Sequence, residues 1–67
     1  MMTLGEYLRG LRLCQNEMSL GKMAEKIGCA KSYVWDVEHD KVMPTLAKAA
    51  LIAKQYKTSL NLMGKYL

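Results

Sequence analysis

The side chains that could engage a ligand in this chain are mainly basic. Eight lysines and two arginines stand against six acidic residues, which gives a net charge of +4. A positive balance of this kind suits a polyanionic partner such as nucleic acid, and a small protein can also be basic without binding one. The charge is therefore compatible with a nucleic-acid partner but does not by itself indicate one.

Catalysis and metal binding have little support in the sequence. Cys14 and Cys29 are widely spaced, and His39 is the only histidine. A metal site needs about four ligands, and these residues provide no nucleophile–base pair or carboxylate dyad. We therefore expect no enzyme, no metal and no cofactor, and we expect both thiols to be buried or half-buried in a reducing cytoplasm.

Residues 19–38 have the spacing of two short helices joined by a sharp turn. Apolar residues recur at helical intervals, in the first helix at Leu20, Met23, Ala24 and Ile27 and in the second at Val34 and Val37. Gly28 lies at the break and is the only residue here that freely takes the left-handed conformation that a sharp helix-ending turn requires. This spacing is typical of a helix-turn-helix, with an ordinary αα-hairpin as the alternative. The second helix of a helix-turn-helix enters the DNA major groove.

The whole chain predicts an all-α fold of five helices in a single domain, residues 1–67. The helices are expected at about 4–14, 20–27, 31–38, 45–56 and 60–66. Thr3 and Glu6 form a capping box before the first helix, whereas Ala30 leaves the third without a side-chain cap. The fourth helix has apolar residues on more than one face and is expected to be the most buried, and Leu60 and Met63 of the fifth are expected to point inward.

No membrane contact is expected. The longest apolar run, residues 49–53, is far shorter than a membrane span. The first residues lack the basic region and the long apolar region of a secretory signal peptide.

Several segments together resemble the Cro/phage-repressor (XRE) family of helix-turn-helix DNA-binding proteins. They are residues 4–12, 23–28, 38–46 and 53–60. The resemblance implies a compact five-helix, lambda-repressor-like domain that usually acts as a dimer on a palindromic operator. Leu20 departs from the family's usual Gln, Asp40 and Lys57 replace its helix-ending Gly, and the first loop is one residue longer.

The resemblance assigns base reading to the start of the third helix, at Lys31, Ser32, Tyr33 and Asp36. Lys31 can donate to guanine and Asp36 can accept from cytosine; a Lys31–Asp36 ion pair or a plain surface charge is an equal alternative for Asp36. Phosphate contacts are expected around two helix starts, from Ser19, Lys22, Lys41, Thr45 and Lys48. For each single lysine, a solvated charge is the simpler interpretation.

Three further features have structural interpretations. Arg12 and Glu38 match a family ion pair that joins the first helix to the end of the third. For Trp35, packing under the 39–43 loop or in a partner interface is favoured over a contact with the sugar-phosphate backbone. The apolar C-terminal residues Leu62, Tyr66 and Leu67 are a candidate dimer patch, with a frayed tail as the alternative.

The sequence therefore predicts a sequence-specific double-stranded DNA-binding regulator. We expect a Cro-like repressor of phage or mobile-element origin that acts as a homodimer, in the cytoplasm and on the nucleoid of a bacterial or phage-infected cell. The alternative is an antitoxin-like or anti-repressor module that binds a regulatory protein partner. Leu20, Trp35 and Asp36, on or near the reading surface, keep this alternative open.

Overall fold

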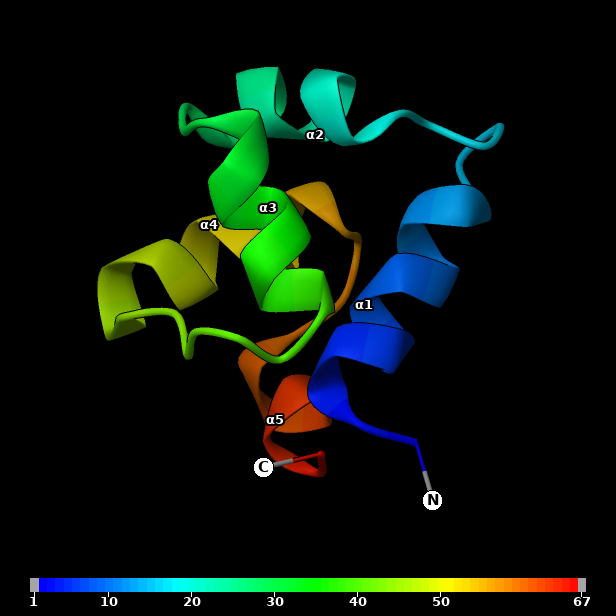
Figure 1. The fold of residues 1–67 in the computed structure, drawn as a ribbon. Coiled ribbons are helices and arrows are strands. Elements are labelled where there is room, and N and C mark those ends of the chain that lie inside the picture. The colour runs from blue at the N-terminus through cyan, green and yellow to red at the C-terminus, as the bar shows by residue number, and fades with distance from the viewer. Residues whose placement is uncertain (1, 67) are drawn as a thin grey trace.

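The computed structural model describes residues 2–66. They form α1 (Leu4–Leu13), α2 (Leu20–Ile27), α3 (Lys31–Glu38), α4 (Leu46–Gln55) and α5 (Leu60–Gly64), with no strand among the described residues. Figure 1 shows α2 across one end of the molecule, α3 in front of α4, α1 beside them and α5 at the opposite end. The predicted all-α, five-helix fold is confirmed.

One buried cluster holds the helices together. It takes apolar side chains from all five helices and from the residue that ends α4: Leu4, Leu8, Met23, Ala24, Ile27, Val34, Val37, Ile52, Ala53, Tyr56 and Met63. The stripe predicted for residues 20–27 supplies three of these residues, whereas Leu20 is only half-buried against the cluster. The helical periodicity of the sequence therefore identified most of this core.

The caps explain where the helices begin. The Thr3 hydroxyl accepts from the Glu6 amide at 3.2 Å, and the Glu6 carboxylate accepts from the Thr3 amide at 2.9 Å, which confirms the capping box. Ser19, Thr45 and Ser59 cap α2, α4 and α5 in the same way with their hydroxyls. Ala30 provides no side-chain cap to α3, as predicted.

Three helix boundaries differ from the predictions. α1 ends at Leu13, α4 covers Leu46–Gln55, and α5 ends at Gly64, so each is shorter than expected. The chain leaves α5 through tighter bonds, from the Lys65 amide to the Leu62 carbonyl and from the Tyr66 amide to the Met63 carbonyl. Terminal turns of this kind end helices one or two residues before the sequence pattern does.

The burial of α4 was predicted wrongly. Its buried residues are Ile52 and Ala53, near its end, whereas Leu46 at its start is 79% exposed. Leu60 of α5 is also 45% exposed, although Met63 is buried as expected. An apolar composition did not reveal that the start of α4 and the start of α5 border an open groove instead of a packed neighbour.

Cys14 is exposed and Cys29 half-buried, so the expectation of burial was wrong for Cys14. Cys14 is the C-cap of α1 and lies beyond the last buried residue of that helix, Arg12. It therefore lies where the chain turns outward into the loop before α2.

Two turns use the left-handed conformation without glycine. Asp40 has φ 57° and Lys57 has φ 59°, at the two positions where the sequence departs from the family's glycine. Asp40 has a compensating role, because its carboxylate accepts from the Thr3 hydroxyl at 2.6 Å and from the Gly5 amide at 3.0 Å. It therefore ties the loop after α3 to the start of α1. Asn16 and Glu17, in the first loop, also have positive φ.

Within residues 2–66, no helix combines the length and the apolar character needed to cross a membrane. The same residues contain no group of three or more His, Cys, Asp or Glu side chains placed to hold a metal ion.

Candidate nucleic-acid interface

The turn between α2 and α3 sets the angle at which α3 projects. Gly28 has φ 84° and ψ 40°, and its amide donates to the Ala24 carbonyl at 2.8 Å. The Cys29 amide donates to the same carbonyl at 3.0 Å, so these two bonds close the last turn of α2. The predicted glycine turn is thus present. α3 then begins at Lys31, and its N-cap residue Ala30 makes no side-chain capping bond.

A buried polar network holds α3 against its neighbours. Arg12 of α1 donates through Nε to Glu38 Oε2 at 2.8 Å and through Nη2 to Oε1 at 2.9 Å. A third Arg12 nitrogen donates to the Met18 carbonyl at 2.6 Å. The Tyr56 hydroxyl, at the end of α4, donates to Glu38 Oε2 at 2.6 Å. The network fixes the end of α3 to α1, to α4 and to the loop before α2.

Burial and pairing shift the titration of two members of this network. The hydrogen bond that Arg12 donates to the Glu38 carboxylate raises the pKa of Arg12, although burial of the guanidinium acts in the opposite sense. Burial raises the pKa of Tyr56, and the hydrogen bond to Glu38 raises it further. Both groups therefore keep their protons over the physiological range, so the network is intact at neutral pH.

The sequence matched Arg12 with Glu38 but missed Tyr56 as their partner. Tyr56 is separated from Glu38 by a loop and a whole helix, and its helical spacing from Ile52 and Ala53 made it appear to be an ordinary core residue. A tyrosine that is almost fully buried needs a hydrogen-bond partner for its hydroxyl. The need of a buried tyrosine hydroxyl for a partner is the one signal by which the Tyr56–Glu38 bond could have been predicted.

The outward face of α3 carries only some of the predicted base-reading residues. Lys31 and Ser32 are exposed, whereas Asp36 is half-buried. Tyr33 is half-buried and packs against the core, where burial raises its pKa. Residues three, four and seven apart share a helix face, so Trp35 and His39 lie on the same outward stripe as Ser32.

The predicted alternative for Asp36, an ion pair with Lys31, is not formed. Among residues 2–66, Arg12–Glu38 is the one ion pair closer than 4.0 Å. Lys31 and Asp36 are five positions apart, so they do not face each other on a helix. Lys31 therefore remains at the start of α3 without a carboxylate partner among the described residues.

Two of the predicted phosphate-binding side chains already act as helix caps. Ser19 Oγ accepts from the Lys22 amide at 3.1 Å, and Thr45 Oγ1 accepts from the Lys48 amide at 3.3 Å. A hydroxyl that accepts in this way still has a hydrogen to donate to a phosphate oxygen. Lys22 and Lys41 are exposed and Lys48 is half-buried.

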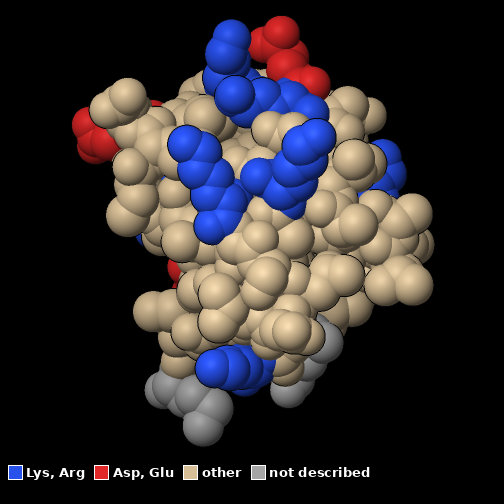
Figure 2. Space-filling model, turned by 180° about the vertical axis from the view of Figure 1, so that it is seen from behind, with Lys and Arg blue, Asp and Glu red and all other residues tan. Residues whose placement is uncertain are grey.

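Basic charge is not confined to the side of α3. Figure 2 shows the opposite side of the molecule from Figure 1, and several Lys and Arg side chains gather in its upper half. The lower half of that side is largely uncharged. Basic side chains therefore also lie on the side of the molecule seen in Figure 2, and charge alone does not select one face.

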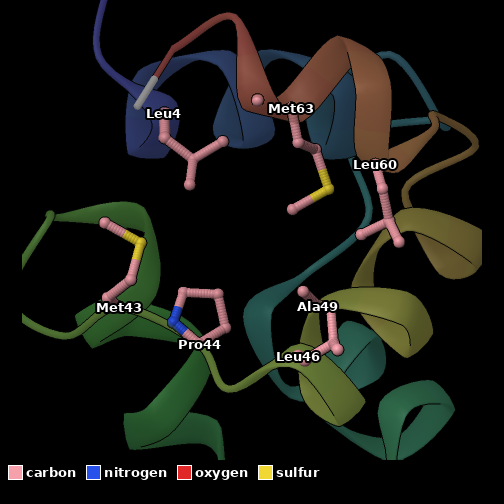
Figure 3. Close-up of a pocket in the computed structure, with 8 residues that line it drawn as sticks. Leu4, Met43, Pro44, Leu46, Ala49, Leu60 and Met63 are labelled. Carbon is pink, nitrogen blue, oxygen red and sulfur yellow. The ribbon is translucent and has the colours of Figure 1, made fainter.

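An apolar groove lies at the other end of the molecule. It has a volume of about 340 Å³ and is lined by Leu4, Met43, Pro44, Leu46, Ala49, Leu60, Met63 and Gly64. In Figure 3, Met43 and Pro44 of the loop before α4 lie on one side of it, and Leu60 and Met63 of α5 lie on another. No charged residue lines the groove.

The described residues of the predicted dimer patch do not form one exposed surface. Leu62 is exposed, but the ring of Tyr66 stacks on Tyr7 of α1 with centroids 4.4 Å apart. Leu67 lies outside the described residues. Met43, Leu46 and Leu60 are exposed apolar residues that lie together at the groove.

A short helix, a glycine turn and a second helix with an exposed outer face define a helix-turn-helix DNA-binding domain. Comparison with protein families agrees, because the helix-turn-helix family model HTH_3 matches residues 8–63. The chain belongs to this XRE-type family and is a DNA-binding transcription regulator of that type. Comparisons with curated proteins and with solved structures return no match.

Proposed function

We propose that the protein is a Cro-like repressor of phage or mobile-element origin that binds a palindromic operator as a homodimer. It would act as a single non-enzymatic domain in the cytoplasm, on the nucleoid. The observation that carries the proposal is the start of α3, where Lys31 and Ser32 are exposed on a helix whose other end is held by buried Glu38. A rigidly held helix with exposed donors at its start suits the reading of base edges.

Lys31 and Ser32 are the proposed base-reading pair, with Asp36 and Tyr33 at the edge of the contact. Ser19, Lys22, Lys41, Thr45 and Lys48 are the proposed phosphate contacts. The hydroxyls of Ser19 and Thr45 lie at the starts of α2 and α4, where backbone N–H groups also favour an anion.

The experiment is selection from randomised duplex DNA followed by sequencing, for the natural protein, Lys31→Ala and Lys54→Ala. Lys54 is exposed in the last turn of α4, so its variant loses the same charge away from α3. The proposal expects a palindrome with half-sites about one helical turn apart, altered at one position by Lys31→Ala and unaltered by Lys54→Ala. Salt-sensitive binding without any enriched motif would contradict it.

For the homodimer we propose the groove and the adjoining Leu62 as the interface, with a second copy of the chain as the occupant. Met43 is 66% exposed and Leu46 79% exposed, and apolar surfaces of this kind mark interfaces. A twofold interface buries the same apolar groove on both copies, which suits a palindromic site.

Sedimentation of Leu46→Glu tests this interface, with Leu51→Glu as the control. Leu51 is 43% exposed on the same helix but does not line the groove. We expect Leu46→Glu alone to abolish the dimer. Equal dimerisation of both variants would exclude the groove, and a stable 1:1 complex with another protein in the absence of DNA affinity would favour the antitoxin-like alternative.

A further inference from the structure

A second hollow lies between α1 and α3, beside the outward face of α3. Its volume is about 440 Å³, and it is lined by Glu6, Arg9, Arg12, Leu20, Trp35, Glu38 and His39. This volume is in the range of about 300–1,000 Å³ in which small ligands bind. The hollow combines an apolar wall with basic groups, unlike the uncharged groove near α5.

The apolar wall is formed by Leu20 and Trp35. Trp35 is 41% exposed, and its indole stacks on the His39 ring with centroids 3.8 Å apart and an interplanar angle of 15°. His39 Nδ1 is also 2.8 Å from the Trp35 carbonyl oxygen. The indole thus packs against the first residue of the 39–43 loop, as favoured from the sequence, but it stays 41% exposed and does not enter the core.

The charges of the hollow differ in their availability. Arg12 and Glu38 satisfy each other in the buried pair. Glu6 accepts from the Thr3 amide within the capping box, so its carboxylate is directed to the start of α1. Arg9 is exposed and lies farther than 4.0 Å from every carboxylate of residues 2–66. Arg9 is thus the cation of the hollow that can engage an anion.

The position of the hollow relates it to the reading face. Trp35 and His39 are three and seven residues after Ser32, on the same side of α3. If Ser32 lies over base edges in the major groove, the flank of α3 that faces α1 lies over one phosphate strand. A sugar-phosphate unit there would meet the indole with its apolar sugar face and Arg9 with its phosphate.

We propose that this hollow receives one deoxyribose-phosphate unit of the bound DNA, with Trp35 and Leu20 against the sugar and Arg9 and His39 at the phosphate. The inference rests on the proposed function and adds a contact that the family match did not assign. Its residues position the duplex and do not read its sequence.

Trp35 is the only tryptophan of the chain, so its fluorescence reports on this hollow alone. The experiment measures acrylamide quenching of Trp35 with and without a saturating duplex, while anisotropy of a labelled duplex reports binding independently. We expect bound DNA to shield Trp35, so the quenching constant should fall at least twofold, a threshold we set from the 41% exposure and the covering of the indole. Raising the protein concentration without DNA should leave quenching unchanged.

Variants give a second measurement. Arg9→Gln should lower the slope of log affinity against log salt by about 0.9, the value for one phosphate contact, whereas Lys54→Gln should leave the slope unchanged. Trp35→Ala should weaken binding roughly fivefold or more and Trp35→Phe much less, since a ring that covers the sugar remains. Circular dichroism melting confirms that each variant is folded.

The outcomes separate the two proposals. Binding by anisotropy with unchanged quenching and an unchanged Arg9→Gln slope would overturn the inference and leave the proposed function standing. Shielding of Trp35 by protein concentration alone would also overturn it, because the indole would then belong to an interface between copies. Absence of any DNA binding would overturn the proposed function and the inference with it.

Discussion

Gly5 of α1 lies directly against the main chain of Glu38 at the end of α3. A β-carbon built on Gly5 would lie 2.7 Å from the Glu38 carbonyl carbon and 2.9 Å from the Val37 carbonyl oxygen. These distances are shorter than any normal contact and involve backbone, which cannot move aside easily. The crossing of α1 and α3 therefore depends on the absence of a side chain at this position.

Gly5→Ala should lower the free energy of unfolding by about 1–3 kcal/mol or more, because the methyl group overpacks the crossing. The matched control is Gly10→Ala in the same helix, where an added β-carbon meets nothing within 4 Å. That variant should gain about 1 kcal/mol from the better helix propensity of alanine. Urea denaturation measures both, and equal effects would show that the crossing is looser than described.

The Arg12–Glu38 pair predicts a strong non-additivity. Arg12→Met leaves the buried Glu38 carboxylate without its cation and should cost about 3–5 kcal/mol. The double variant Arg12→Met/Glu38→Leu removes both charges and should cost less than Arg12→Met alone. Chemical denaturation of the two variants provides the test, and simple additivity would mean that the pair is solvated.

Tyr56 predicts a loss of stability at alkaline pH. Its pKa is raised in the folded state, so above the ordinary tyrosine pKa of about 10 the unfolded chain releases a proton that the folded chain retains. Stability should be constant below this pH and fall above it, by at most about 1.4 kcal/mol per pH unit from this group. The melting temperature of Tyr56→Phe should fall less steeply between neutral and alkaline pH. Parallel curves would assign the alkaline loss to other groups.

The two left-handed turns predict opposite effects of glycine. Lys57→Gly relieves the strain of a side chain at φ 59° and should be stabilising by up to about 1 kcal/mol. Asp40→Gly relieves similar strain but removes the acceptor for the Thr3 hydroxyl and the Gly5 amide, so it should be destabilising by about 1 kcal/mol or more. Thermal melting compares the two, and stabilisation by both would show that the Asp40 contacts contribute little.

The sequence predicted the elements with local signals. The capping box at Thr3, the glycine turn at Gly28 and the uncapped Ala30 depend on neighbouring residues alone, and the structure contains all three. Exposure of Leu46 and Leu60 could not be predicted in this way, because the groove between them depends on how α4, α5 and the preceding loop pack. Periodicity identifies an apolar face but does not say whether another element covers it.

The candidate interface likewise combines features that the sequence predicts with features that depend on tertiary packing. Its proposed base-reading residues follow from the family's motif, whereas the hollow with Arg9 and Trp35 arises from the packing of α1 against α3. The Tyr56 bond to Glu38 and the Asp40 bond to Gly5 join residues 18 and 35 positions apart. Nothing in the local sequence marks such partners, so these contacts could be found only in the folded chain.

The network around Glu38 has a consequence for the order in which the chain acquires its structure during synthesis. Its members come from the first helix, the third helix and the end of the fourth, at Arg12, Glu38 and Tyr56. When only the residues up to the end of α3 have left the ribosome, the exposed chain still lacks Tyr56, whose hydroxyl completes the network. Domains generally fold as units on the ribosome, so α3 should acquire its final orientation only after Tyr56 has left the exit tunnel.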